Sequence, residues 1–374
     1  MSPRERTLAA LTFGNPDKIP FTPGGGREST RARWHKEGVP EDVDPHEYLW
    51  EVLGIEKPQT KPCPGPGVNF RVMPQFEEKV LEHKNGHYVC QDWKGNVCEI
   101  SDEFDITYLR TAKDFVTRRW IKCPVENRDD WEQMKQRYQL DTPGRLPDDF
   151  EDRCKASVDR DAFLNIHFSG PFWQLREWCG FEGLCMMMIE EPELVHEMAA
   201  FWKDFISSIL QRIFQHVVPD QVHLSEDMAY KAKSMISPAM AREFCKPCWD
   251  AWAKQSFDAG VPLVGIDSDG FIEELIPLWI ESGMNCCDPI EVAAHCDINR
   301  FRDLFGHKMA YRGGVDKRCI AKGGQAIRDE LKRIEPVVKD GGYIPGCDHG
   351  VPHDISWENF VDYGRLLAKM TGWL

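Results

Sequence analysis

Short apolar runs alternate with longer amphipathic segments through the second half of the chain. The apolar runs are 163–168, 221–224, 262–266, 284–287, 309–311 and 342–344. The segments with helical spacing are 192–214, 238–257, 271–281, 298–305 and 321–338. This alternation predicts a parallel sheet whose strands are joined by crossover helices. With a further strand near Phe21, the pattern favours a (β/α)8 TIM barrel over a doubly wound sheet, because no Gly-rich nucleotide turn opens it.

The first half of the chain is less regular. A helix is expected over residues 2–12, with Ser2 as its N-cap and Pro3 in its first turn. Residues 87–90 and 97–100 flank the turn sequence DWKGN and predict a hairpin. Residues 35–75 are expected to form loops and short helices, and 109–155 a helical or irregular stretch. We therefore expect one domain over 1–374, a barrel whose N-terminal extension and hairpin occupy about 35–155, with a last helix at 357–369 covering it.

Charge and composition exclude several classes of protein. The chain has 46 Lys and Arg against 61 Asp and Glu, a formal net charge of −15. A negative average surface argues against binding to nucleic acid or to an acidic membrane. No apolar run is long enough to span a bilayer and no secretory signal is recognisable, so a cytoplasmic location is expected. The 14 cysteines are scattered and are expected to be reduced thiols. A homodimer is one assembly compatible with these features.

Five successive predicted strands are followed by ionisable residues. The strand ends read SEDMAYK at 225–231, DSDG at 267–270, DPIE at 288–291, RGGVDK at 312–317 and PGCDHG at 345–350. In a barrel these positions meet at the mouth, where catalytic residues lie. An individual aspartate such as Asp269 could instead cap a helix or a turn. The convergence of five such ends predicts one polar site.

Several segments resemble the uroporphyrinogen decarboxylase-like superfamily. They are RERTLAALTFGNPDKIPF near the start, GPFW at 170–173, DMAYK, ISPAM, DSDG and GGYIPGCDHGVPHDIS at 341–356. The resemblance extends over essentially the whole chain and implies a (β/α)8 barrel. The superfamily contains cofactor-free decarboxylases and cobalamin-dependent methyltransferases. The decarboxylase signatures match poorly, since GGGREST and the QDWKGN hairpin stand in their places and a net charge of −15 suits a highly carboxylated substrate badly.

The methyltransferase arm implies a metal site at the barrel mouth. Its members bind zinc through a His-x-Cys-Gly strand end and a cysteine of the final strand. Here Asp267 and Asp269 stand at the first place and His349 at the second, with Glu291 as a further candidate ligand. Carboxylates and imidazole can hold zinc or another divalent metal, and this donor set would make the ion a stronger Lewis acid. The alternative is a metal-free hydrogen-bonded network around the substrate.

The expected activity is that of a corrinoid-dependent methyltransferase. It would move a methyl group from a small O- or N-methylated compound to a corrinoid protein, because no corrinoid-binding module is recognisable in the chain. Catalytic roles are expected for Glu226, Tyr230 and Asp267. Substrate contacts are expected for five further residues: Arg27, Phe172, Trp173, Lys231 and Arg312.

Two other functions remain open on the sequence. A lyase acting on a carboxylated small molecule would use Arg27, Arg31 or Arg312 to clamp the carboxylate. A non-enzymatic ligand-binding barrel would require the strand-end carboxylates to be structural.

Overall fold

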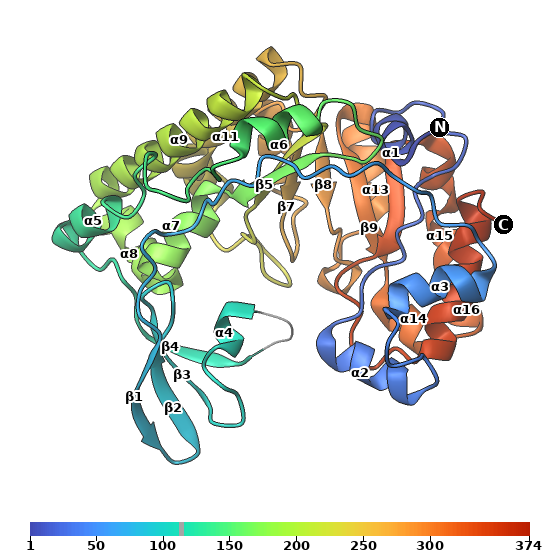
Figure 1. The fold of residues 1–374 in the computed structure, drawn as a ribbon, viewed down its shortest axis with the longest axis horizontal. Coiled ribbons are helices and arrows are strands. Elements are labelled where there is room, and N and C mark those ends of the chain that lie inside the picture. The colour runs from blue at the N-terminus through green and yellow to red at the C-terminus, as the bar shows by residue number, and fades with distance from the viewer. Residues whose placement is uncertain (112–115) are drawn as a thin grey trace.

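A six-stranded parallel sheet forms the centre of the computed structural model, which describes residues 1–111 and 116–374 (Figure 1). The strand order β10-β9-β8-β7-β6-β5 places each strand beside its successor in the chain. The strands are β5 (Asn165–Ser169), β6 (Gln221–Ser225), β7 (Leu263–Asp267), β8 (Cys286–Asp288), β9 (Ala310–Val315) and β10 (Tyr343–Cys347). The six strands predicted for the second half of the chain are therefore confirmed.

Helices connect these strands and pack along the outside of the sheet (Figure 1). They are α7 (Pro171–Cys179), α8 (Phe181–Glu190), α9 (Pro192–Phe214), α10 (Pro238–Met240), α11 (Lys246–Asp258), α12 (Ile276–Glu281), α13 (Ile298–Phe305), α14 (Lys317–Lys322), α15 (Gln325–Asp340) and α16 (Trp357–Met370). Repeated strand–helix units with all strands parallel are the architecture of the predicted (β/α)8 barrel.

The strand expected near Phe21 is an extended segment rather than a regular strand. The N–H of Cys347 donates to the carbonyl of Pro23 (3.3 Å), and that of Val351 donates to the carbonyl of Gly25 (2.9 Å). Gly26 forms an isolated parallel bridge with Val351. Proline lacks the N–H that a regular ladder needs, so the segment runs beside the carboxyl end of β10 without forming a continuous strand.

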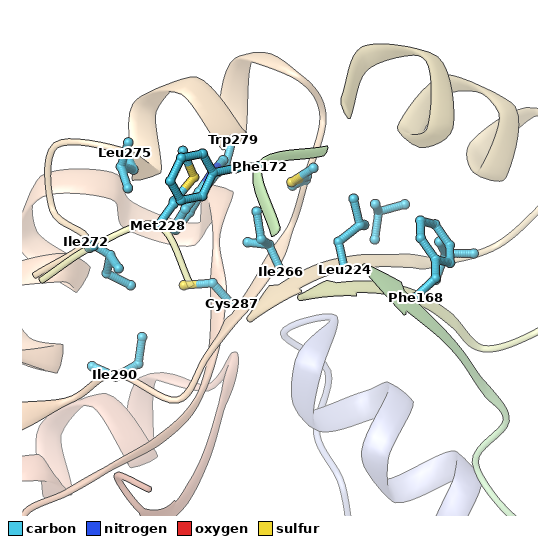
Figure 2. Packing of buried hydrophobic residues seen from close by; sticks show 14 of the residues in the cluster. Phe168, Phe172, Leu224, Met228, Ile266, Ile272, Leu275, Trp279, Cys287 and Ile290 are labelled. Carbon is cyan, nitrogen blue, oxygen red and sulfur yellow. The ribbon is translucent and has the colours of Figure 1, made fainter. Parts of the chain in front are cut away.

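Strand alternation separates the core of the molecule from the site. Phe168, Leu224, Ile266 and Cys287 are aligned across β5 to β8 and are all buried beneath the helices (Figure 2). The next row, one residue further along each strand, is polar and contains Ser169, Ser225, Asp267 and Asp288. Because successive side chains point to opposite faces of a strand, this polar row faces the interior of the barrel.

The opposite end of the barrel is closed by the first helix, α1 (Pro3–Leu11). Ser2 caps this helix as predicted, and its hydroxyl accepts the N–H of Glu5 (3.2 Å). Ala10 and Leu11 pack in one buried cluster with four residues from the first halves of the strands: Leu263, Cys286, Ala310 and Ile344. The barrel therefore has an apolar floor.

A separate antiparallel sheet lies to one side of the barrel (Figure 1). Its strands, in order, are β1 (Lys79–Lys84), β2 (His87–Gln91), β3 (Val97–Ser101) and β4 (Arg118–Lys122). The pairing of β2 with β3 confirms the predicted hairpin. The stretch 109–155 was expected to be helical or irregular and instead includes β4, because an exposed edge strand needs no apolar pattern.

The remaining helices belong to the N-terminal half. They are α2 (Glu28–Lys36), α3 (Pro45–Leu53), α4 (Tyr108–Thr111), α5 (Arg128–Lys135) and α6 (Phe150–Ala156). No helix among the described residues combines the length and the apolar character that crossing a bilayer requires.

Candidate functional site at the carboxyl ends of the strands

Three carboxylates meet at the mouth of the barrel. Asp267 is the last residue of β7, Asp269 follows two residues later, and Asp227 follows β6. One carboxylate oxygen from each lies within 4.8 Å of the other two. The three side chains line a small pocket of about 290 Å³, together with Trp173, Pro289, Cys347, His349 and Gly350. The structure thus brings Asp267, Asp269 and His349 together as predicted and adds Asp227.

Asp227 is held in an unusual backbone conformation. Its φ of 40° lies in the left-handed region, which few residues other than glycine adopt and which aspartate tolerates better than most. The Asp227 carboxylate accepts the N–H of Asp269 (3.2 Å), and its carbonyl accepts a bond from Arg176 (2.8 Å). These contacts fix the carboxylate against the loop that carries Asp269.

The carboxyl of Asp267 lies between a hydroxyl and a second carboxylate. It accepts a bond from the hydroxyl of Ser225 (3.0 Å). Burial, and then the nearby carboxylate of Asp288, raise the pKa of Asp267 well above its ordinary value. Burial opposes ionisation of Asp288 too, yet His223 at 3.1 Å holds the pKa of Asp288 below its usual range. His223 therefore favours the ionised form of Asp288 beside Asp267.

His349 points its protonated nitrogen at Asp269. Its Nδ1 accepts the N–H of Gly350 (2.7 Å) and lies 2.8 Å from Nη2 of Arg27. The proton therefore belongs on Nε2, which donates to the Asp269 carboxylate (3.0 Å). In this arrangement His349 orients Asp269, and Arg27 at the start of α2 orients His349.

Glu226 is fully buried beside the cluster. One carboxyl oxygen accepts the indole N–H of Trp249 (2.6 Å) and the other accepts the backbone N–H of Trp173 (3.0 Å) in the first turn of α7. Burial raises the pKa of Glu226 to about 8, although the N–H groups oppose this. The carboxyl serves α7 in place of an N-cap side chain, since Gly170 offers none. Its catalytic role stays a prediction.

Glu291 binds a lysine and a backbone N–H in the loop that carries Asp269. It accepts the N–H of Gly270 (3.1 Å) and forms an ion pair with Lys317 (2.9 Å). Asp348, fully buried, accepts the N–H of Val292 (2.9 Å). Burial raises the pKa of Asp348 to about 6. These contacts connect the loops after β8, β9 and β10, and metal ligation by Glu291 stays a prediction.

The predicted substrate-binding residues occupy different surroundings. Trp173 lines the small pocket, whereas Phe172 is 1% exposed and packs in the core (Figure 2). Tyr230 is 74% exposed and lines a larger cleft outside the pocket, and Lys231 beside it is exposed. Arg312 lies on β9, where Nη2 donates to the side-chain oxygen of Gln221 (2.8 Å) inside the barrel. Trp173 is thus the predicted aromatic residue placed to contact a molecule in the pocket.

The donor set at the mouth fits a hard divalent ion. Asp227, Asp267 and Asp269 offer three carboxylate oxygens, the ligand type that Mg²⁺, Mn²⁺ and Ca²⁺ prefer and that zinc also accepts. Cys347 lines the same pocket, but burial raises the pKa of its thiol to about 12. Each carboxylate disfavours ionisation of its neighbours, and a bound cation would relieve that repulsion.

Two features of the site were missed at the sequence level. Asp227 was included in the strand end SEDMAYK but was not predicted as a member of the acidic cluster. The pair of His223 and Asp288 was missed because His223 lies within a strand rather than after it. The signal for His223 was present, since every second residue of β6 faces the polar interior, whereas Asp227 lies beyond the end of that strand.

Comparisons with known proteins identify the family. The family model described as "Uroporphyrinogen decarboxylase (URO-D)" matches residues 121–363. The uroporphyrinogen decarboxylase of Alcanivorax borkumensis is 23% identical over 212 residues, which cover 54% of this chain and 57% of that relative. The chain therefore matches little more than half the length of this curated relative.

A solved structure shares the whole architecture. A methyltransferase from Methanosarcina mazei matches with a TM-score of 0.57 and 14% sequence identity over 99% of each chain. At that identity the likeness shows the fold. Because the family model covers well over half of the sequence, this chain belongs to the uroporphyrinogen decarboxylase (URO-D) family.

Proposed function

We propose that this chain is a methyltransferase that moves a methyl group from a small O- or N-methylated compound to the corrinoid of a partner protein. The proposal rests on the acidic pocket. Asp227, Asp267 and Asp269 surround about 290 Å³, a space suited to a small molecule. A highly carboxylated substrate would be repelled by these groups, whereas a metal-bound ether or a methylated ammonium group would be attracted.

The chemistry requires positive charge on the atom that loses the methyl group. When the bond between the methyl carbon and its oxygen or nitrogen breaks, the electron pair stays on that heteroatom. The charge of this electron pair must be neutralised for the heteroatom to be a good leaving group. A divalent ion held by the three aspartates would supply Lewis acidity at that atom. In a substrate that is already a quaternary ammonium, the carboxylates bind the cation directly.

The chain's own residues position the donor. Trp173 lines the pocket beside the three carboxylates and would contact a methylated molecule bound there. His349 donates to the Asp269 carboxylate, and Tyr230 lines the cleft outside the pocket. The exposed side of the pocket is where the methyl acceptor arrives.

The alternative is a lyase that acts on a carboxylated small molecule. It is favoured by the name of the Alcanivorax relative and by the position of Arg27 near the mouth. The other two proposed clamps are engaged elsewhere, since Arg31 pairs with Asp44 (2.6 Å) and Arg312 binds Gln221.

Metal analysis combined with two activity assays tests the proposal. Protein purified without added metal is expected to hold about one divalent ion per chain, as a three-carboxylate site predicts. Asp227→Asn, Asp267→Asn and Asp269→Ala should each lose the metal and the transfer of methyl groups to Co(I) cobalamin. Asp303→Asn, an exposed aspartate on α13, is the matched control and should change neither.

His349→Ala separates the two roles considered for that residue. Loss of the metal is expected if His349 is a ligand, and weakened but measurable binding if it orients Asp269. Rapid release of CO2 from a carboxylated substrate, with no corrinoid present, would overturn the methyltransferase proposal and favour the lyase.

A further inference from the structure

A large cleft lies outside the small pocket, between the antiparallel sheet and the barrel. Its volume is about 1810 Å³, and its walls include β4 on one side and residues of α7 and α8 on the other. Trp173 and His349 line both the cleft and the small pocket. The pocket therefore opens into the cleft.

The cleft is positively charged although the protein is acidic. Among the described residues that line it, eight are Lys or Arg and five are Glu. The chain as a whole has a formal charge of −15. This local reversal of sign attracts acidic groups to one face of a molecule that otherwise repels them.

Three guanidinium groups in the cleft are held over indole rings instead of being paired with carboxylates. They are Arg71 over Trp93 at 5.1 Å, Arg118 over Trp120 at 5.1 Å and Arg176 over Trp173 at 4.8 Å. Within the described part of the chain, no carboxylate oxygen lies within 4.0 Å of their nitrogens. These cations retain their capacity to pair with the carboxylates of another molecule.

The cleft also exposes large apolar side chains. Trp120, Ile121, Met186 and Phe181 are 52%, 50%, 53% and 43% exposed. Arginine, methionine and aromatic residues are the types enriched at the centres of protein interfaces. The volume exceeds the roughly 300–1,000 Å³ of a typical small-molecule pocket. Both features fit a protein surface better than a small ligand.

We propose that this cleft is the docking surface for an acidic face of the corrinoid protein, gripped between β4 and α8. The inference rests on the proposed function, because that function supplies the partner. Docking here brings the partner's corrinoid over the opening of the small pocket. The antiparallel sheet, which contributes nothing to the aspartate cluster, thereby acquires a role in recognition.

A charge-reversal pair tests the docking surface. Arg118→Glu with Arg119→Glu changes the cleft side of the sheet, and Lys79→Glu with Lys84→Glu is the matched control on β1, the opposite edge of the same sheet. With the cobalamin-loaded corrinoid protein as acceptor, the first pair should raise KM about tenfold or more, and the control should leave KM within about twofold. Turnover with free Co(I) cobalamin should be the same in both.

Two further measurements test the same docking surface. Trp120→Ala should also raise KM for the corrinoid protein, because an exposed tryptophan at an interface centre contributes strongly to binding. The wild-type KM should rise with ionic strength, and this rise should be smaller in the cleft variant. Equal KM values for the cleft and control pairs would overturn the docking proposal.

Failure of the proposed function is distinguishable from failure of the docking surface. If the wild type transfers methyl groups to neither free cobalamin nor the corrinoid protein, the function is wrong. Calorimetric titration of the same corrinoid protein then tests the surface alone. Binding that Arg118→Glu with Arg119→Glu abolishes would retain the docking surface, and absence of binding to the wild type would refute it.

Discussion

Glu226→Ala tests whether a buried carboxyl holds the first turn of α7. The side chain is fully buried, and its two oxygens accept the indole N–H of Trp249 and the backbone N–H of Trp173. Gly170 provides no capping side chain for this helix. Removal of the carboxyl leaves both donors without these acceptors in a region closed to water.

The expected loss in the free energy of unfolding follows from those two hydrogen bonds. A buried donor that loses its acceptor costs about 1–3 kcal/mol, which gives about 2–6 kcal/mol for the two. Relief of the cost of burying the carboxyl offsets part of this sum. We expect a net loss of about 3–5 kcal/mol, a large share of the roughly 5–15 kcal/mol that stabilises a typical domain.

Urea unfolding followed by tryptophan fluorescence measures the effect. Glu226→Gln retains one carbonyl acceptor and should lose about 1–3 kcal/mol, less than the alanine variant. Glu182→Ala, an exposed glutamate on α8, is the control and should change stability by no more than about 0.5 kcal/mol. An alanine variant within about 1 kcal/mol of the wild type would refute the capping role. A folded glutamine variant with kcat reduced a hundredfold or more would instead support the catalytic acid.

Three further changes test other parts of the structure. Gly170→Ala places a Cβ against the carboxyl carbon of Glu226 and should cost at least about 2 kcal/mol in urea unfolding, whereas Gly183→Ala on α8, where the added methyl meets nothing, should be neutral or stabilising. Leu11→Ala opens the apolar floor of the barrel and should lower stability by about 2–4 kcal/mol; a loss under about 1 kcal/mol would contradict the packing. Hydrogen bonding to Arg128 lowers the pKa of Glu197 to about 2, so its contribution is present above pH 4.5 and is lost as the pH falls toward 2. Because this carboxylate is about one third exposed, Glu197→Gln should cost only about 1 kcal/mol at pH 7 and less at pH 3, and a difference independent of pH would refute the assignment.

The regular part of the fold was predictable because burial imposes a pattern. Each strand of the barrel is buried on its helix-facing side, so an apolar run marks it. The prediction ended the β7 run at Ile266, but the strand includes Asp267, because a polar residue at the mouth continues the ladder as well as an apolar one. Strands β1 and β4 were not predicted, since their exposed sequences KVLEHK and RRWIK carry no such pattern.

The sequence predicted only those residues of the site that lie at the carboxyl ends of the predicted strands. Asp267 and Asp269 lie at the end of β7, and His349 follows β10. Both strands end at the same end of the barrel, so the topology alone brings these residues together. Two details depend on backbone geometry instead. The left-handed conformation at Asp227 turns that carboxylate into the cluster, and the close approach of Arg27 to His349 joins residues 322 positions apart. Neither has a local signal in the sequence.

The opening of the small pocket into the cleft has a kinetic consequence. A protein docked in the cleft as proposed would lie over the pocket and would block the entry of a methyl donor from that side, while α1 packs against the opposite end of the strands. If the proposed function and docking surface hold, binding would follow a compulsory order, with the donor first and the corrinoid protein second. Excess partner should inhibit turnover by occupying the enzyme before its donor arrives, and raising the donor concentration should relieve that inhibition.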